Sequence, residues 1–255
     1  MRLFRKKPSR AMFLIFEGIV YTMVLNLYNP FIQMFAKRMG AQDIHIALLN
    51  SVPPLVAIFI LIPLGIVIER INRKKTTVLV LLGLSSFFYG AIALVPIIPH
   101  EAKVILYVIL IGLLNFPNSL YLATWQSFFA DNFTGTYAKR VYSVRSKFGQ
   151  FAGLFTVLVS GIMLTSIPKS AQERLFLYQV FYAVCFAMTV FQLYLFSKID
   201  EKHVNGETHR SKISFRIRKS DFAGIIRNRE FIIFCACGVA FHFTWQMGWP
   251  LYFIY

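Results

Sequence analysis

Few residues of this chain could do chemistry, and Glu17 stands out among them. It is the only acidic residue well inside one of the long apolar stretches of the sequence. An ionisable side chain at membrane depth is costly, so each one is a candidate for function. Because desolvation favours the neutral form of a carboxyl group, Glu17 is a candidate for taking up and releasing a proton. In the alternative interpretation, Glu17 lies near the inner headgroups and pairs with a basic neighbour.

Amide side chains form a second group with regular spacing. Asn26, Asn29 and Gln33 are three and four residues apart, which places them on one face of a helix. The same arrangement returns in two further apolar stretches, with Asn115 and Asn118, and with His242 and Gln246. Such residues either contact a polar ligand or form hydrogen bonds between helices.

The residue types that most enzymes need are not gathered in this sequence. Membrane enzymes normally require clustered acids, a histidine-rich metal set, or a nucleophile with a base. The cysteines, Cys185, Cys235 and Cys237, fit no standard zinc or redox spacing and are expected to be core residues. We therefore expect no enzyme, no metal and no cofactor.

The elements that must position these residues are helices in a membrane. The chain is 57% hydrophobic and 15% charged, with a mean hydropathy of +0.59. Apolar stretches of about 20 residues span a bilayer as helices, because every backbone polar group must be satisfied internally. Seven stretches qualify, and they predict an all-α polytopic fold: 11–36, 44–68, 76–98, 103–127, 148–167, 172–198 and 231–255.

The distribution of basic residues predicts the orientation of these helices. Alternate connections, together with the N-terminal tail, hold 22 of the 27 Lys and Arg residues. Positively charged loops stay on the cytoplasmic side, so the N-terminus is predicted to be cytoplasmic and the C-terminus outside. This topology accounts for the net charge of +16 and argues against a nucleic-acid partner.

Composition divides the chain into three parts. Residues 1–198 are expected to form a six-helix transmembrane bundle, 199–230 a cytoplasmic linker, and 231–255 a seventh helix. The linker ends in a basic segment whose apolar residues have helical spacing, which suits a helix on the membrane surface; a simple solvated linker is the alternative. An amide four residues before a proline occurs at Asn26 and again at Gln246, which suggests that residue 231 begins a second half.

A basic turn between the second and third apolar stretches carries a known motif. It resembles motif A of the major facilitator superfamily of transporters, Gly-x-x-x-Asp-Arg-x-Gly-Arg-Arg/Lys, at Gly65, Arg70, Arg73 and Lys74. Glu69 replaces the aspartate and Asn72 the glycine. In the family the acidic residue latches the two halves of the transporter, so the resemblance implies a gating role. The alternative is a positive-inside turn without such a role.

A second resemblance lies between the fourth and fifth apolar stretches. Many members of the superfamily carry an acidic residue and an arginine-rich segment here, represented by Asp131, Arg140 and Arg145. We expect Asp131 to pair with Arg140 or Arg145 and so clamp the loop. However, the fourth stretch lacks the intramembrane arginine of many proton-coupled drug antiporters, and the fifth lacks their Gly-Pro pair, so that subclass is not favoured.

The resemblance implies a secondary active transporter in the plasma membrane, which moves a small solute by alternating access with Glu17 as the proton-coupling candidate. Since the superfamily has about twelve helices, a C-terminal half is expected to be missing. Helices 1, 4 and 7 line the central cavity of the family. The implied substrate contacts are therefore Asn26, Asn29, Gln33, Asn115, Asn118, Trp245 and Gln246. The alternatives are a truncated, non-transporting remnant and a seven-helix membrane sensor or scaffold.

Overall fold

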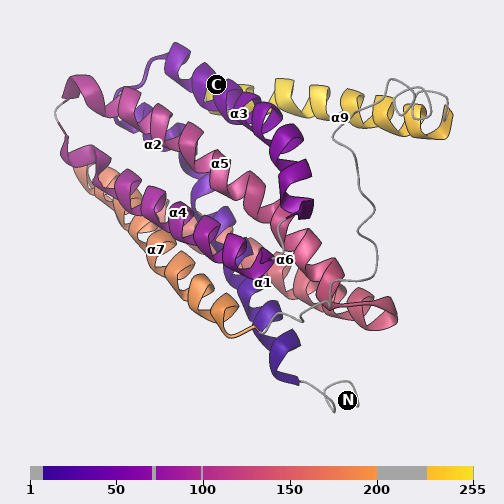
Figure 1. The fold of residues 1–255 in the computed structure, drawn as a ribbon. Helices are drawn as coiled ribbons and strands as arrows, with labels where there is room; N and C mark the ends of the chain where they lie inside the picture. The colour runs from indigo at the N-terminus through magenta and orange to yellow at the C-terminus, as the bar shows by residue number, and fades with distance from the viewer. Residues whose placement is uncertain (1–7, 71–72, 99, 200–228, 255) are drawn as a thin grey trace. The chain divides into compact units, whose positions relative to one another are not determined.

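A computed structural model describes residues 8–70, 73–98, 100–199 and 229–254, without the side chains of 8–9, 58–70, 100–101 and 245–254. Within these ranges every regular element is a helix, as predicted (Figure 1). The elements are α1 (Pro8–Tyr28), η1 (Asn29–Phe31), α2 (Ile32–Arg38), α3 (Asp43–Arg70), α4 (Lys74–Leu94), η2 (Val95–Ile97), α5 (His100–Asn132), α6 (Gly135–Ser166), α7 (Ala171–Ser197) and α9 (Arg229–Ile254).

The predicted membrane spans correspond to long helices of the structure. Five of them in the described part are long and apolar enough to cross a bilayer: Arg10–Arg38, Lys74–Ile97, Ala102–Asn132, Gly135–Ser166 and Ala171–Ser197. The first of these combines α1, η1 and α2. Helices α3 and α9 correspond to the remaining two predicted stretches. The polytopic all-α fold is thereby confirmed.

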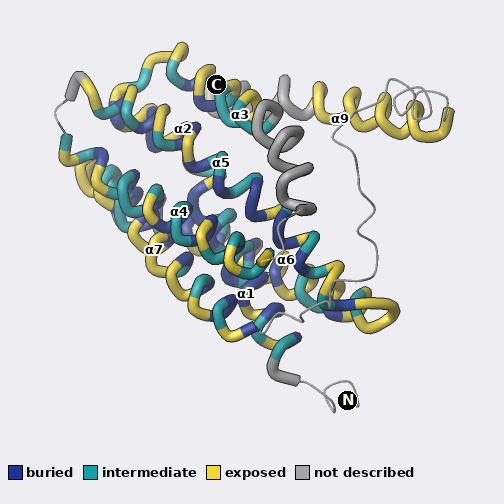
Figure 2. Tube along the Cα trace, viewed as in Figure 1, coloured by how far each residue is buried: buried dark blue, intermediate teal, exposed yellow. Residues whose placement is uncertain are grey.

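The chain divides into two compact units, residues 1–202 and 203–255. Within the first unit, α1 packs against α6 and α7, α4 lies against α5 and α7, and α3 runs along α5. Figure 2 shows the buried residues on the faces where these helices meet. The proposed linker at 199–230 lies almost entirely outside the described residues, so its amphipathic segment and the orientation of the membrane helices stay predictions.

The first membrane helix is interrupted at Asn29, Pro30 and Phe31, which form the 3-10 turn η1. Pro30 lies in the first turn of η1 and has no backbone N–H to donate. Nearby, the Tyr107 hydroxyl donates to the carbonyl oxygen of Ile32 at 3.1 Å. A side chain of α5 therefore stabilises the backbone where α2 begins.

The fifth membrane helix begins much earlier than predicted. It was expected to start at residue 148, but α6 starts at Gly135, and only Phe133 and Thr134 separate it from α5. Gly135 has a φ of 62°, a left-handed conformation that favours glycine at such a tight turn. Hydropathy detects the part of a helix that faces lipid, whereas α6 continues beyond it with charged residues on its exposed face. The basic segment of this connection is consequently helical.

Two glycines of α6 allow close packing against α1. Gly149 and Gly153 are both buried. A Cβ atom added at Gly149 would lie 2.9 Å from Thr22 Oγ1, and one added at Gly153 would lie 2.6 Å from Asn26 Nδ2. Small residues at such positions let helix backbones approach within a membrane. At Gly161, by contrast, an added Cβ would meet nothing within 4 Å.

The substitution Gly153→Val should therefore destabilise the bundle by about 1–3 kcal/mol, because overpacking forces α1 and α6 apart. Thermal unfolding of the purified protein in detergent micelles measures this effect. Gly161→Val is the matched control and should leave the unfolding midpoint almost unchanged. Equal midpoints for the two variants would contradict the close α1–α6 packing.

Candidate functional site: a buried carboxylate network

The carboxyl group of Glu17 lies at the centre of a polar network inside the first unit. Glu17 is fully buried, with an exposed fraction of 0%. Its Oε1 atom accepts hydrogen bonds from the Tyr121 hydroxyl and from Gln192 Nε2, the latter at 2.7 Å. Its Oε2 atom pairs with Arg145 Nη2 at 3.2 Å. The network thus joins α1 to α5, α6 and α7.

Arg145 reaches this network across the surface of α1. Its guanidinium carbon lies 3.8 Å from the centre of the Trp125 ring, a cation–π contact with α5. A Cβ atom at Gly18 would lie 2.1 Å from Arg145 Nε, so the glycine next to Glu17 makes room for the guanidinium. Because removal of either charge would leave the other buried and uncompensated, Glu17 and Arg145 depend on each other.

The loop clamp expected at Asp131 has a different partner. In place of an ion pair with Arg140 or Arg145, Asp131 Oδ2 pairs with Lys74 Nζ at 2.5 Å. Lys74 also donates to Ser127 Oγ at 2.7 Å. The predicted pairing assumed that the segment after Asp131 is a loop. In the structure Arg145 lies about three turns into α6, and its side chain contacts Glu17 instead. Arg140 is exposed.

The basic turn also connects helix ends. Lys75 Nζ donates to the carbonyl oxygen of Ser197 at 2.8 Å, which links the start of α4 to the end of α7. Together with the Lys74–Asp131 pair, this contact joins α4, α5 and α7 at one end of the bundle. Arg73 is exposed at the start of α4. The side chains of Glu69 and Arg70 and the surroundings of Gly65 are not described, so the gating role of these residues stays a prediction.

The amide candidates are distributed over several contacts rather than one site. Asn118 joins three helices: its Nδ2 donates to the hydroxyls of Tyr28 and Tyr89 at 3.2 and 3.4 Å, and its Oδ1 accepts from Ser85 at 3.0 Å. The other amides bond as follows: Gln33 to Asn50 at 2.7 Å, Asn115 to the carbonyl oxygen of Pro53 at 2.5 Å, and Asn26 to that of Thr22 at 2.8 Å.

Three substrate-contact candidates remain: Asn29, Trp245 and Gln246. Asn29 is exposed at the interruption of the first helix. The side chains of Trp245 and Gln246 lie outside the described residues. Hydrogen bonding between helices, the alternative considered from the sequence, is what the structure gives for Gln33, Asn115 and Asn118.

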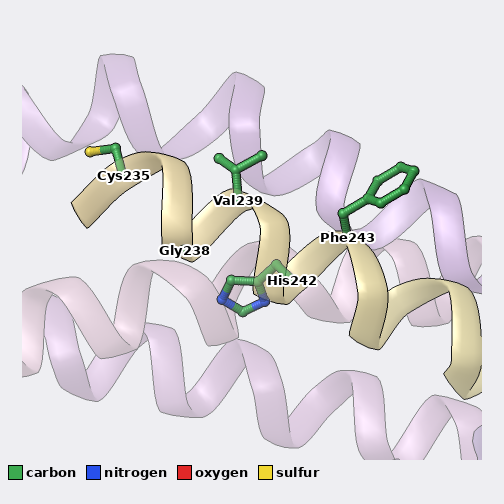
Figure 3. A pocket seen from close by; sticks show the side chains of 5 residues that line it. All are labelled: Cys235, Gly238, Val239, His242 and Phe243. Atoms are coloured by element: carbon green, nitrogen blue, oxygen red, sulfur yellow. The ribbon is translucent and has the colours of Figure 1, made fainter. Parts of the chain in front are cut away.

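Helix α9 carries a shallow apolar hollow, which Figure 3 shows from close by. Its lining residues are Cys235, Gly238, Val239, His242 and Phe243. Cys235 and Cys237 are exposed here, which corrects the expectation of core positions, while Cys185 in α7 is buried as predicted. Among the described residues, no three His, Cys, Asp or Glu side chains lie close enough to hold a metal ion.

Sequence comparison assigns the chain to a class of membrane protein. The family model of the Major Facilitator Superfamily matches residues 14–255. No curated protein and no solved structure matches the chain. The chain belongs to the major facilitator superfamily, whose members are multi-pass membrane transporters rather than enzymes. The motif at Gly65–Lys74 therefore led to the correct family.

Because Glu17 and Arg145 depend on each other, we expect the double variant to lose less stability than the two single variants together. Arg145→Gln leaves a buried carboxylate without its cation, and should lower stability by about 3–5 kcal/mol. The double variant E17Q/R145Q removes both charges and should recover part of this loss. Unfolding midpoints in detergent measure both effects, with Lys147→Gln as a control at an exposed residue of α6. If the losses caused by E17Q and by R145Q alone add up to the loss of the double variant, the two charges are not coupled.

The Lys74–Asp131 pair should behave differently, because the Asp131 side chain is 44% exposed. A solvent-exposed pair contributes about 0–1 kcal/mol and is screened by salt. A double-mutant cycle with Lys74→Gln and Asp131→Asn isolates this pair from the bond between Lys74 and Ser127. We expect a small coupling energy that shrinks as ionic strength rises. A coupling energy as large as that between Glu17 and Arg145 would contradict the interpretation of Lys74 and Asp131 as a weak, solvent-exposed pair.

Proposed function

We propose that this member of the superfamily is a secondary active transporter of the plasma membrane, which moves a small solute by alternating access and couples its movement to protons at Glu17. The observation that carries the proposal is the complete burial of Glu17 within a network of three other helices. A charged group inside a membrane helix is costly unless it is paired, and such groups commonly belong to ion and proton pathways.

The network supports proton coupling because a change of charge at Glu17 alters contacts on several helices at once. Protonation would weaken the attraction between Glu17 and Arg145, and so loosen the connection between α1 and α6. Tyr121 and Gln192, which are uncharged at neutral pH, would continue to hold the carboxyl group on α5 and α7. A local proton-binding event is thereby linked to the relative positions of helices, as alternating access requires.

Solute contacts are proposed at the amide residues identified from the sequence. Among the amide candidates whose side chains are described, Asn29 is the exposed one, at the break in the first helix. Asn118 bonds to residues of α1 and α4, so a solute that replaced one of these bonds would affect the packing of both helices. We propose Asn26, Gln33, Asn115, Trp245 and Gln246 as further contacts, with the motif A residues as the gate.

Transport activity distinguishes this proposal from a seven-helix sensor or scaffold and from a non-transporting remnant. The protein is reconstituted into liposomes and adsorbed to a solid-supported membrane electrode. Small carboxylates, sugars and amino acids are then applied as concentration jumps at several pH values. A transporter produces solute-dependent currents or luminal pH changes. Their absence for every solute would instead favour a sensor, a scaffold or a remnant.

In the same assay, Glu17→Gln should abolish uptake driven by a pH gradient, because the amide cannot bind and release a proton. The variant should remain folded, which thermal unfolding in detergent checks. Asp43→Asn is the matched control: it also neutralises an acid, but an exposed one in the first turn of α3. Unchanged pH dependence in E17Q would remove Glu17 from the coupling mechanism.

A further inference from the structure

The Glu17 network contains more hydrogen-bond donors than acceptors. Both oxygen atoms of Glu17 already accept bonds, from Tyr121, Gln192 and Arg145. A guanidinium group has five N–H donors, whereas the structure gives Arg145 a single acceptor, Glu17 Oε2. Arg145 Nε and Trp125 Nε1 are both buried without a hydrogen-bond partner. Because a buried donor without a partner costs about 1–3 kcal/mol, this site lacks an acceptor.

The two partners of the ion pair differ in how firmly they are held. Glu17 is fully buried and bound by three helices, whereas the Arg145 side chain is 12% exposed. Arg145 holds Glu17 through one nitrogen atom at 3.2 Å, and otherwise rests on the face of Trp125. Bidentate pairing, the strong arrangement of arginine with a carboxylate, is absent from this contact. The guanidinium is therefore the partner that can exchange.

The backbone at Gly18 lies against Arg145 Nε, since even a Cβ atom at this glycine would collide with that nitrogen. An incoming ligand must therefore approach the terminal nitrogen atoms of the guanidinium, and of the two unpartnered donors it can satisfy Trp125 Nε1 but not Arg145 Nε. The indole N–H of Trp125 belongs to the ring on which that guanidinium stacks, so it offers a second donor in the same neighbourhood. A group with two acceptor oxygens on one carbon atom suits these donors.

We propose that Arg145 and Trp125 bind the carboxylate group of the transported solute, and that Arg145 exchanges Glu17 for this carboxylate when Glu17 is protonated. The inference rests on the proposed transport function and specifies its substrate class. In the exchange, one proton from water binds to Glu17 Oε2, the oxygen that loses the bond from Arg145. Tyr121 and Gln192 keep their bonds to Oε1.

Charge balance inside the bundle favours a carboxylate and a proton together. Glu17 and Arg145 are neutral as a pair, so a monocarboxylate alone would add an uncompensated negative charge to a buried site, which is unfavourable. One proton on Glu17 restores neutrality. The titratable groups that face Glu17 are Tyr21 of α1, Tyr121 of α5 and Arg145 of α6, and α7 contributes the uncharged Gln192. Glu17 is the carboxyl group of this cluster and hence its proton acceptor.

Binding of simple probes to the purified protein tests this inference. Acetate and butyrate are titrated against acetamide and butyramide, their uncharged counterparts, while intrinsic tryptophan fluorescence is recorded. Carboxylates should change the fluorescence and the amides should not. The affinity should fall by about tenfold per pH unit once Glu17 is ionised, as linkage to one proton requires. Trp125→Phe removes both the reporter and one proposed donor, so it should abolish the fluorescence change and also weaken acetate binding measured by isothermal titration calorimetry.

Variants at the ion pair separate the roles of the two charges. In E17Q the amide mimics protonated Glu17, so acetate should bind with an affinity that no longer depends on pH. The double variant E17Q/R145Q keeps the site uncharged and should not bind acetate. Lys147→Gln, which neutralises an exposed cation of the same helix, should bind as the unmodified protein does.

Several results would overturn the inference: equal responses to acetate and acetamide, acetate binding retained in E17Q/R145Q, or pH dependence retained in E17Q. Inorganic phosphate bound as tightly as acetate would overturn the carboxylate preference. If carboxylates fail to bind while E17Q still abolishes proton-linked currents, the inference is wrong and the transport function stands. If carboxylates bind as expected but no solute produces a current, the binding site stands and the transport function fails.

Discussion

The buried carboxyl group of Glu17 is the constraint on which the first unit of this protein depends. A carboxylate with no exposed surface must find its partners within the protein, and here they come from helices that are far apart in sequence. Tyr121, Arg145 and Gln192 each satisfy part of this requirement. Because hydrophobic burial contributes little to helix association in lipid, such polar contacts help to determine which helices meet.

The glycines beside this network have a related role. Gly18, Gly149 and Gly153 lie where α1 and α6 approach each other, and any side chain there would collide with Arg145, Thr22 or Asn26. Gly149 and Gly153 let the backbones of α1 and α6 approach each other, and Gly18 leaves room for the long side chain of Arg145. Close packing and charge compensation thus depend on the same small residues.

The fold was largely predictable from the sequence, whereas the centre of the site was not. Long apolar stretches identify membrane helices, and the motif from Gly65 to Lys74 identified the family. Hydropathy could not show that α6 begins at Gly135, because its charged first turns do not resemble a membrane span, and Arg145 was consequently paired with Asp131. Spacing arguments compare residues of one helix only, so no periodicity connects Glu17 with Arg145, 128 positions away. A signal for Gln192 did exist, since it is an amide within an apolar stretch.

The short turn between α5 and α6 has a consequence for how the site could be altered in evolution. Trp125 and Arg145 lie on two consecutive helices, α5 and α6, which are joined only by Phe133 and Thr134 before the left-handed Gly135. An inserted or deleted residue at this turn would change how the start of α6 is placed relative to the end of α5. The contact between the guanidinium and the indole depends on that placement. The length of this turn therefore matters to the site, although the turn lies outside the apolar core.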